Sequence, residues 1–241
     1  MNVLLASNLQ EIREVERLER LGSGHDGKVY KYRELALKLL KYDIEQRKEK
    51  GLLSFEKANY FVNECMTKRI TMPQDILLDE SGIYTGIVME CIDKVEDSSR
   101  FFTEDFYISG LEIKEDVDKL SENRVGIKDI NRGSFIIGRD FLHICDVDKF
   151  IDYRKQSKVN VEMLNRDAYN FLLSKFIVLN IMERIKRERN LTKEERTTLN
   201  RWVKYQVKEA KMLTYIEQEL KDPNQLRFED FIETQKQKIL R

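Results

Sequence analysis

The 241-residue sequence has little glycine, almost no proline and few histidines. Its only prolines are Pro73 and Pro223, and all ten glycines precede residue 139. Because glycine and proline mark turns, we expect the turn-rich structure in the first part of the chain and long helices in the last.

Cysteine is also scarce: Cys65, Cys91 and Cys145 lie far apart, with no C-x-x-C pair. With only two histidines, this argues against a disulfide framework or a structural zinc site and favours a cytoplasmic protein. No run of about 18 apolar residues occurs, so we expect no membrane span. The opening MNVLLASNLQEIREVER turns acidic too soon for a signal peptide.

Neither sign of charge is in excess, since 43 Lys and Arg residues balance 43 Asp and Glu residues. This balance argues against a dedicated nucleic-acid-binding protein, and we expect no nucleic acid among the partners. A basic run at residues 184–189 would suit an anionic partner, but on a charged helix a solvated face is the simpler interpretation.

Hydrophobic periodicity predicts strands and one helical stretch before residue 93. Residues 8–20 fit either a short helix or an opening strand, and residues 28–32 and 34–40 alternate as a hairpin that turns at Arg33-Glu34. Two more strands are expected at 75–79 and 84–92. Between these pairs of strands, residues 43–72 indicate one or two helices with an apolar stripe of Phe55, Ala58, Phe61, Val62, Cys65 and Met66.

The second part of the chain is predominantly helical in pattern. A weakly periodic helix is expected near 103–120, followed by a small hairpin of residues 135–137 and 141–144 around Gly138-Arg139-Asp140. From about residue 160 onward the pattern is helical, with a long apolar helix over 167–189, and a T-x-x-E signal at Thr192 predicts another helix start. The pattern of residues 228–240 predicts a final amphipathic helix.

A G-x-G-x-x-G-x-V motif is the first feature with chemical content; its members are Gly22, Ser23, Gly24, Gly27 and Val29. Glycines let the main chain approach phosphate oxygens closely and offer N–H donors. A glycine-rich turn alone is a weak signal. Here the motif leads into a hairpin, whereas in a dinucleotide-binding fold it would lead into a helix.

Lys38 follows on the returning arm of that hairpin, between two leucines. A lysine there needs either a solvent-facing side or a charged partner. The next helical stretch holds Glu64 at the edge of its apolar stripe, with Glu56 as a rival carboxylate; for both, a solvated helix face is the simple alternative. The strand ending at Glu90 to Ile92 is, taken alone, a core strand.

The strongest pattern is I-K-D-I-N-R-G-S, which ends at Ser134, followed by D-V-D at residues 146–148. The separation of Asp129 from Asp146 fits a hairpin between two loops. Phosphoryl transfer needs one carboxylate near the attacking hydroxyl and another that holds Mg²⁺ against the phosphates. Either aspartate alone would more often be a solvated turn residue, but the two together with the hairpin are specific.

Taken in order, these motifs resemble the protein-kinase superfamily from Gly22 to about Leu173. The resemblance implies an α+β, bilobed protein-kinase-like fold. Residues 1–93 would form an N-lobe with a small antiparallel sheet and one helix, and residues 94–241 a compact, mainly helical C-lobe. It implies that Lys38 holds the α/β-phosphates of ATP and pairs with Glu64, and that Glu90 to Ile92 meet adenine.

The same resemblance implies roles for several aspartates. Asp129 would take the place of the catalytic base, Asp146 that of the Mg²⁺ ligand, and Asp167 that of the residue bracing the catalytic-loop backbone. For Asp167, a helix N-terminal carboxylate interacting with the helix dipole is a compatible alternative.

The chain departs from the kinase pattern around this site. Ser134 stands where the metal-binding asparagine is expected, and a hydroxyl is the poorer Mg²⁺ ligand. Asp148 could add charge near the metal or lie on the surface. The other departures are Ile127-Lys128 in place of His-Arg, Asn131 in place of the usual lysine, and Val147-Asp148 in place of Phe-Gly.

The resemblance therefore predicts an ATP- and Mg²⁺-dependent phosphotransferase acting on a protein Ser/Thr or small-molecule hydroxyl. Only 18 residues and no A-P-E motif separate Asp148 from Asp167, which weakens the protein-substrate interpretation. The alternative is a pseudokinase that binds nucleotide as a regulatory or interaction module, which Ser134 supports. A third interpretation is an unrelated α+β binding domain.

Overall fold

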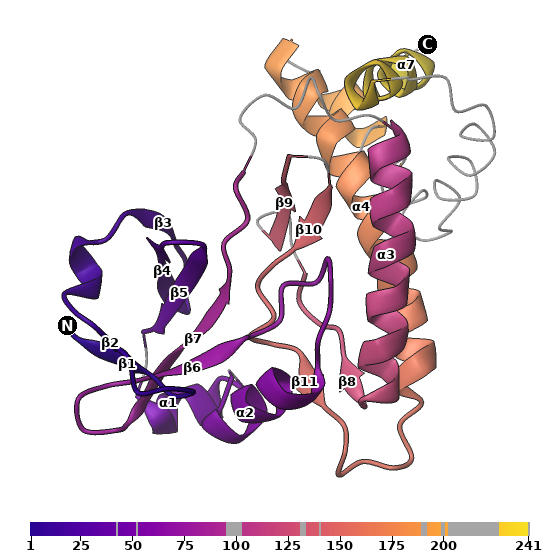
Figure 1. Ribbon diagram of the computed structural model, residues 1–241. Coiled ribbons are helices and arrows are strands. Elements are labelled where there is room, and N and C mark those ends of the chain that lie inside the picture. Colours follow the sequence, from indigo (N-terminus) through magenta and orange to yellow (C-terminus); the bar gives the residue numbers. More distant parts are fainter. Residues whose placement is uncertain are drawn as a thin grey trace.

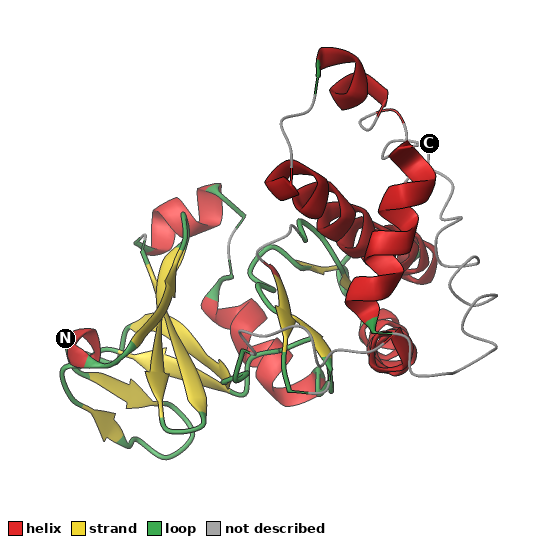
Figure 2. Ribbon diagram, turned by 90° about the horizontal axis from the view of Figure 1, so that it is seen from above, coloured by secondary structure: helices red, strands yellow, loops and turns green. Residues whose placement is uncertain are grey.

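The computed structural model describes residues 1–41, 43–51, 53–94, 103–130, 134–139, 141–188, 192–198, 201 and 227–240. A β-sheet lies beside a group of long helices, with a small hairpin between them (Figures 1 and 2). The expected α+β class is confirmed. None of the helices in the described ranges is long and apolar enough to span a bilayer.

Seven antiparallel strands form one curled sheet in the order β2-β1-β6-β7-β5-β4-β3. The predicted hairpin of β4 and β5 is confirmed, and Arg33 in its turn adopts a left-handed φ of 56°. The strands are β1 (Val3–Leu5), β2 (Glu11–Ile12), β3 (Arg20–Ser23), β4 (Gly27–Tyr32), β5 (Leu35–Leu40), β6 (Asp75–Leu78) and β7 (Tyr84–Glu90).

The first 20 residues fold differently from either simple alternative. Leu9 and Glu14 both have a left-handed φ, which interrupts any continuous helix or strand over residues 8–20. The segment instead forms β2, a 3₁₀ turn (Val15–Arg17) and the start of β3, and β1 pairs with both β2 and β6. The strand alternative was thus right in part, and β1 was not predicted. This hairpin buries Val3, Leu5, Ile12 and Val15 against the sheet.

Two helices precede β6, namely α1 (Ile44–Glu49) and α2 (Phe55–Glu64). Ser54 caps α2, because its Oγ accepts a hydrogen bond from the Lys57 backbone N–H at 3.3 Å. The apolar stripe buries Ala58 and Phe61 as predicted. Two members of that stripe are errors. Phe55, the first residue of α2, is 49% exposed; Met66 leaves the helical register because α2 ends at Glu64, and it is 83% exposed.

The helical part contains α3 (Thr103–Glu122), α4 (Val161–Glu188) and α7 (Phe228–Leu240), with α3 alongside α4 (Figure 1). The predicted hairpin is confirmed as β9 (Phe135–Ile137) and β10 (Leu142–Ile144); Asp140 lies outside the described residues. A second short pair joins β8 (Val125–Gly126) to β11 (Ile151–Asp152). The T-x-x-E signal is also confirmed, since Thr192 and Glu195 cap each other reciprocally.

Sheet and helices share one large hydrophobic core. Its members come from both sides of residue 93 and include Phe61, Ile76 and Ile87 as well as Ile113, Leu142 and Ile177. The segment before β6 joins the two parts directly, because Ile70 bridges Ile144 in parallel.

Asp116 of α3 fastens the same segment through its side chain. Its buried carboxylate accepts hydrogen bonds from three consecutive backbone N–H groups, those of Lys68, Arg69 and Ile70, at 2.6 to 3.0 Å. The sheet is thereby held at a fixed place on the helical part, and the cavity described below lies between them.

Candidate functional site

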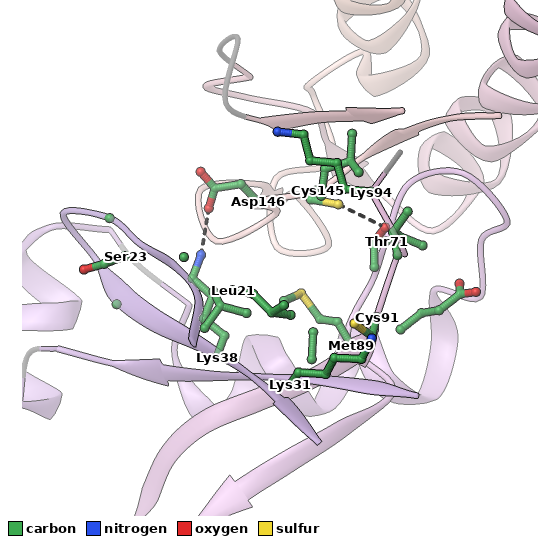
Figure 3. A pocket seen from close by; sticks show the side chains of 18 of the residues that line it. Leu21, Ser23, Lys31, Lys38, Thr71, Met89, Cys91, Lys94, Cys145 and Asp146 are labelled. Carbon is green, nitrogen blue, oxygen red and sulfur yellow. Dashed lines mark hydrogen bonds and ion pairs between the residues drawn. The ribbon is translucent and has the colours of Figure 1, made fainter. Parts of the chain in front are cut away.

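A cavity of about 1010 Å³ separates the β3–β4 turn from the loops that flank β9 and β10. Figure 3 shows Lys38 and Asp146 pointing toward one another, with Met89 on the adjacent strand β7 and Cys91 just beyond its end. The cavity is lined by most of the residues singled out in the sequence: Gly22, Ser23, Gly24, Gly27, Val29, Lys38, Glu90, Ile92, Asp129 and Asp146. It is not lined by Glu64, Ser134 or Asp148.

The glycines of the turn divide into two kinds. At Gly27 a Cβ atom would lie 2.4 Å from the Leu39 carbonyl oxygen, so the fold itself requires glycine there. At Gly22 and Gly24 a Cβ atom would meet nothing within 4 Å, and neither residue has a left-handed φ. The described structure therefore does not explain these two glycines, which border the cavity. A ligand that approaches the main chain closely would explain them.

Lys38 is placed by the sheet, where its backbone pairs with Val29 on one side and Ile87 on the other. Its side chain is 9% exposed, and Nζ forms ion pairs with Asp146 at 2.7 Å and with Asp148. Burial, the largest single influence, lowers the pKa of Lys38, but Asp148 and Asp146 outweigh it and raise the pKa above its ordinary value. Lys38 is therefore a charged lysine at the inner end of the cavity.

The two carboxylates around Lys38 differ in exposure. Asp146 lines the cavity with 43% of its side chain exposed, and its backbone has a left-handed φ of 74°. The Asp148 side chain is 2% exposed, and its Oδ1 has no hydrogen-bond partner within the part of the chain that is described. Burial raises the pKa of Asp148, while the contact with Lys38 opposes that rise. The expectation that Asp148 could be a surface residue is therefore wrong.

A lysine of α2 also contacts the loop that carries Asp146 and Asp148. Lys57 Nζ donates a hydrogen bond to the backbone carbonyl of Asp148 at 2.9 Å. Burial lowers the pKa of Lys57 to about 8. Sequence reasoning missed Lys57, although it lies four residues before Phe61 and hence on the buried face of the helix.

The structure does not bring Glu64 to Lys38. Glu64 is exposed in the last turn of α2, where its backbone carbonyl accepts a hydrogen bond from Asn123 Nδ2 at 2.7 Å. Tyr60 fixes the same turn, because its hydroxyl donates to the Asn123 carbonyl at 2.6 Å and its ring lies 3.4 Å below the Arg154 guanidinium. With α2 held in this orientation, neither Glu64 nor the exposed Glu56 pairs with Lys38.

Asp129 lines the cavity and has a left-handed φ of 59°. Its Oδ2 is 2.5 Å from Nζ of Lys149, which also lines the cavity. That hydrogen bond raises the pKa of Lys149. Sequence reasoning looked for such a lysine near Asn131, which lies outside the described residues, and did not consider the one that follows Asp148.

The three expected metal ligands do not all face the cavity. Ser134 is fully buried at the base of β9, where its carbonyl accepts a hydrogen bond from the Cys145 backbone N–H at 2.7 Å. Asp146 alone of the three lines the cavity. No group of three or more His, Cys, Asp or Glu side chains arranged to hold a metal occurs in the described ranges. Of these three predicted ligands, only Asp146 therefore offers its side chain to a metal ion in the cavity.

The loop leading to Asp129 is braced by Asn165 of α4. Asn165 is buried; its Oδ1 accepts from the Ile127 backbone N–H at 2.8 Å, and its Nδ2 donates to the Val125 carbonyl at 2.8 Å. The sequence assigned this role to Asp167, but Asp167 is exposed. Because Asn160 caps the helix and α4 begins at Val161, Asp167 lies in the second turn, so the helix N-terminal interpretation is also wrong.

The adenine side expected from the resemblance consists of Met89, Glu90 and Ile92, all at the cavity. The backbone N–H of Cys91 is used within the fold, because it donates to the Glu34 carbonyl at 3.1 Å. Cys145 also lines the cavity, and burial raises the pKa of its thiol to about 11, so it stays protonated at neutral pH. Comparison of the sequence with protein-family models and with curated proteins finds no match.

Proposed function

We propose that this chain is an ATP- and Mg²⁺-dependent phosphotransferase of the protein-kinase-like type, which transfers the γ-phosphoryl group to a hydroxyl. The observation that carries the proposal is the composition of the cavity. Glycines that the fold does not require, a buried charged lysine and two aspartates of different loops line one space, although they are up to 124 residues apart in the chain, from Gly22 to Asp146.

The residues support distinct parts of the reaction. The glycine turn lets phosphates approach the main chain closely, and Lys38 offers a fixed positive charge for the α/β-phosphates. Met89 at the end of β7 gives an apolar surface for adenine, and the main chain from Glu90 to Ile92 would meet its polar edge. The acceptor oxygen would bond to the γ-phosphorus while the bond from that phosphorus to the bridging oxygen breaks, and ADP leaves with the electron pair.

Asp129 suits the role of proton acceptor. Lys149 contacts its Oδ2, and no hydrogen bond to Oδ1 occurs among the described residues, so Oδ1 is available to take the hydroxyl proton. The Lys149 ammonium also borders the cavity, where it would offset the negative charge that develops on the transferred phosphoryl oxygens.

Asp146 fits a magnesium site of the kind that proteins build with nucleotides. Mg²⁺ keeps several waters and takes one or two carboxylates together with substrate phosphates, so a single exposed carboxylate beside the phosphate lysine is adequate. When bound, the ion supplies charge neutralisation to the phosphates. Ser134 is buried behind β9 and does not suit this role in the described arrangement.

The segment after Asp148, residues 149–160, favours a small-molecule hydroxyl over a protein Ser/Thr as the acceptor of the phosphoryl group. Residues 149–160 run close to β8, because β11 pairs with it and the Tyr153 backbone N–H donates to the Arg124 carbonyl at 2.8 Å. A Cβ atom at Gly126 would lie 2.4 Å from the Tyr153 ring, so glycine makes this approach possible. The segment therefore leaves little surface on which a peptide could lie.

A nucleotide-binding module without transfer is the second candidate. The observation that favours it is the burial of Ser134, which leaves Asp146 as the one expected metal ligand at the cavity. Under this alternative the chain binds ATP but releases no ADP.

Thermal unfolding of the full chain with millimolar ATP, with and without MgCl₂, tests nucleotide binding. A ligand at 100 times its Kd stabilises a protein by about 2.7 kcal/mol, which gives a clear shift in Tm. Phosphate transfer is then followed as ADP release and as ³²P incorporation into protein or into added polyols. No Tm shift would refute both candidates, and a shift without ADP release would favour the second.

A further inference from the structure

We infer that Asp148 is the positioning residue that holds Lys38, in place of a carboxylate from α2; this rests on the proposed nucleotide-binding role of Lys38. The starting point is the surroundings of the Lys38 ammonium. Both of its ion-pair partners come from the D-V-D loop, Asp146 at 2.7 Å and Asp148 in closer contact. The described part of α2 contributes no carboxylate to it.

The difference in burial gives these two aspartates different tasks. Asp146 is 43% exposed and borders the cavity, so it is accessible to a ligand. Asp148 is 2% exposed and lies outside the cavity lining, so a ligand cannot displace it without opening the protein. When phosphates enter, Lys38 can exchange Asp146 for a phosphate oxygen and keep Asp148.

Helix α2 supports Asp148 with a lysine. Lys57 Nζ donates to the Asp148 carbonyl, so the main chain and the carboxylate of Asp148 each contact a different lysine. Because Tyr60 and the Glu64 carbonyl are bound to Asn123, the helix keeps Lys57 facing the loop. In the expected arrangement, a carboxylate of the helix would contact Lys38. Here the helix contributes a lysine instead, and the carboxylate that contacts Lys38 comes from the loop.

Asp148 therefore has a specific thermodynamic role. A buried ammonium needs a partner of opposite charge, and one that remains in place when the phosphates bind keeps Nζ directed at them. Removing that partner should weaken the binding of phosphate-bearing ligands. The binding of a nucleoside such as adenosine should stay unchanged, because it has no phosphate for Lys38 to contact.

The test compares Asp148→Asn with Glu64→Gln, which makes the same chemical change at the rival carboxylate. Isothermal titration calorimetry with ADP and with adenosine measures each Kd for the full chain. We expect Asp148→Asn to weaken ADP binding about tenfold with adenosine within twofold of wild type, and Glu64→Gln to change neither. In a Lys38→Met background, Asp148→Asn should change the ADP Kd by less than twofold.

The outcomes separate this inference from the proposed function. If wild type binds neither ADP nor adenosine, the proposed function fails before any variant is compared. If wild type binds ADP, equal ADP affinity in Asp148→Asn, or a tenfold loss in Glu64→Gln, overturns the inference. Equal losses for ADP and adenosine in Asp148→Asn also overturn it, since they indicate a general structural role.

A folding control keeps the test decisive. Should Asp148→Asn not fold, the double variant Lys38→Met/Asp148→Asn removes both charges of the pair. The inference expects this double variant to regain a cooperative thermal transition, because the unpaired lysine was the cause of the defect. A double variant that remains unfolded shows that Asp148 acts independently of Lys38 and overturns the inference.

Discussion

The sheet side and the loop side of the cavity differ in what fixes their residues. On the sheet side, Lys38 lies in a continuous backbone register between Val29 and Ile87, and Gly27 fits directly under a neighbouring carbonyl. On the loop side, Asp129 and Asp146 have left-handed backbones and are held by ion pairs with lysines. The sheet side thus depends on close backbone packing, and the loop side on charge. Substitutions at the closely packed glycines of the sheet side should therefore lower stability, and substitutions of the charged residues on the loop side should change the chemistry.

The largest effect is expected from Asp129→Asn on the loop side. Loss of the proton acceptor should lower the rate of phosphoryl transfer by about 10²- to 10⁴-fold. The ADP Kd and the Tm should stay close to wild type, because Asp129 is exposed and lies at the edge of the cavity. Initial rates of ADP release and calorimetric titration measure the two quantities. An unchanged rate would remove Asp129 from the chemistry.

Gly86→Ala on the sheet side should destabilise the fold. Its Cβ would lie 2.2 Å from the Lys38 carbonyl oxygen, and a backbone atom cannot give way as a flexible side chain does. Overpacking of this kind costs about 1–3 kcal/mol, which urea denaturation would measure as a lower midpoint. A midpoint equal to that of wild type would contradict the close packing described for β5 and β7.

Lys149→Met should reduce the rate of transfer about tenfold, an effect of about 1.4 kcal/mol on the barrier, with a smaller change in KM. Lys128→Met is the matched control, since Lys128 is exposed beside Asp129 in the chain but does not line the cavity. Steady-state kinetics of both variants give the comparison. An equal loss of rate in the two variants would show that charge near the cavity, and not the Lys149 contact, is what matters; a rate equal to wild type in Lys149→Met would remove Lys149 from the chemistry.

The smallest change in stability is expected for Gly24→Ala. Open space surrounds the added methyl group, so the free energy of unfolding should stay within about 0.5 kcal/mol of wild type. Affinity for ADP should nevertheless fall several-fold, because the methyl group would stand between the main chain and the phosphates. Urea denaturation and titration on the same sample test this. A loss of stability as large as that of Gly86→Ala would remove the distinction between the two kinds of glycine.

The strand of Lys38, the glycine turn and the hairpin after Asp129 could be predicted from short sequence patterns. Alternation places Lys38 on a strand, and the glycine spacing places its turn beside the cavity. The hairpin between Asp129 and Asp146 also follows from short apolar runs around Gly138. Each of these features is decided within about ten residues, where periodicity and turn chemistry are informative.

Pairings between distant side chains could not be predicted in the same way. Whether Lys38 meets Glu64 or Asp148 depends on how α2 is rotated, and contacts of Tyr60 with Asn123 and Arg154 decide that rotation. The replacement of Asp167 by Asn165 depends on which face of α4 is buried: Asn165 is on the buried face and Asp167 is exposed.

The hydrogen bonds to Asp116 fix the point at which the sheet is attached to α3. Lys68, Arg69 and Ile70 are fixed to α3 immediately before β6, so this short segment is a pivot for any rotation of the sheet relative to the helices. Strand β3, which leads into the glycine turn, is the edge strand that lies farther from β6 in the order of the sheet. Any such rotation would therefore move Thr71 little and the glycine turn, which follows β3, much farther.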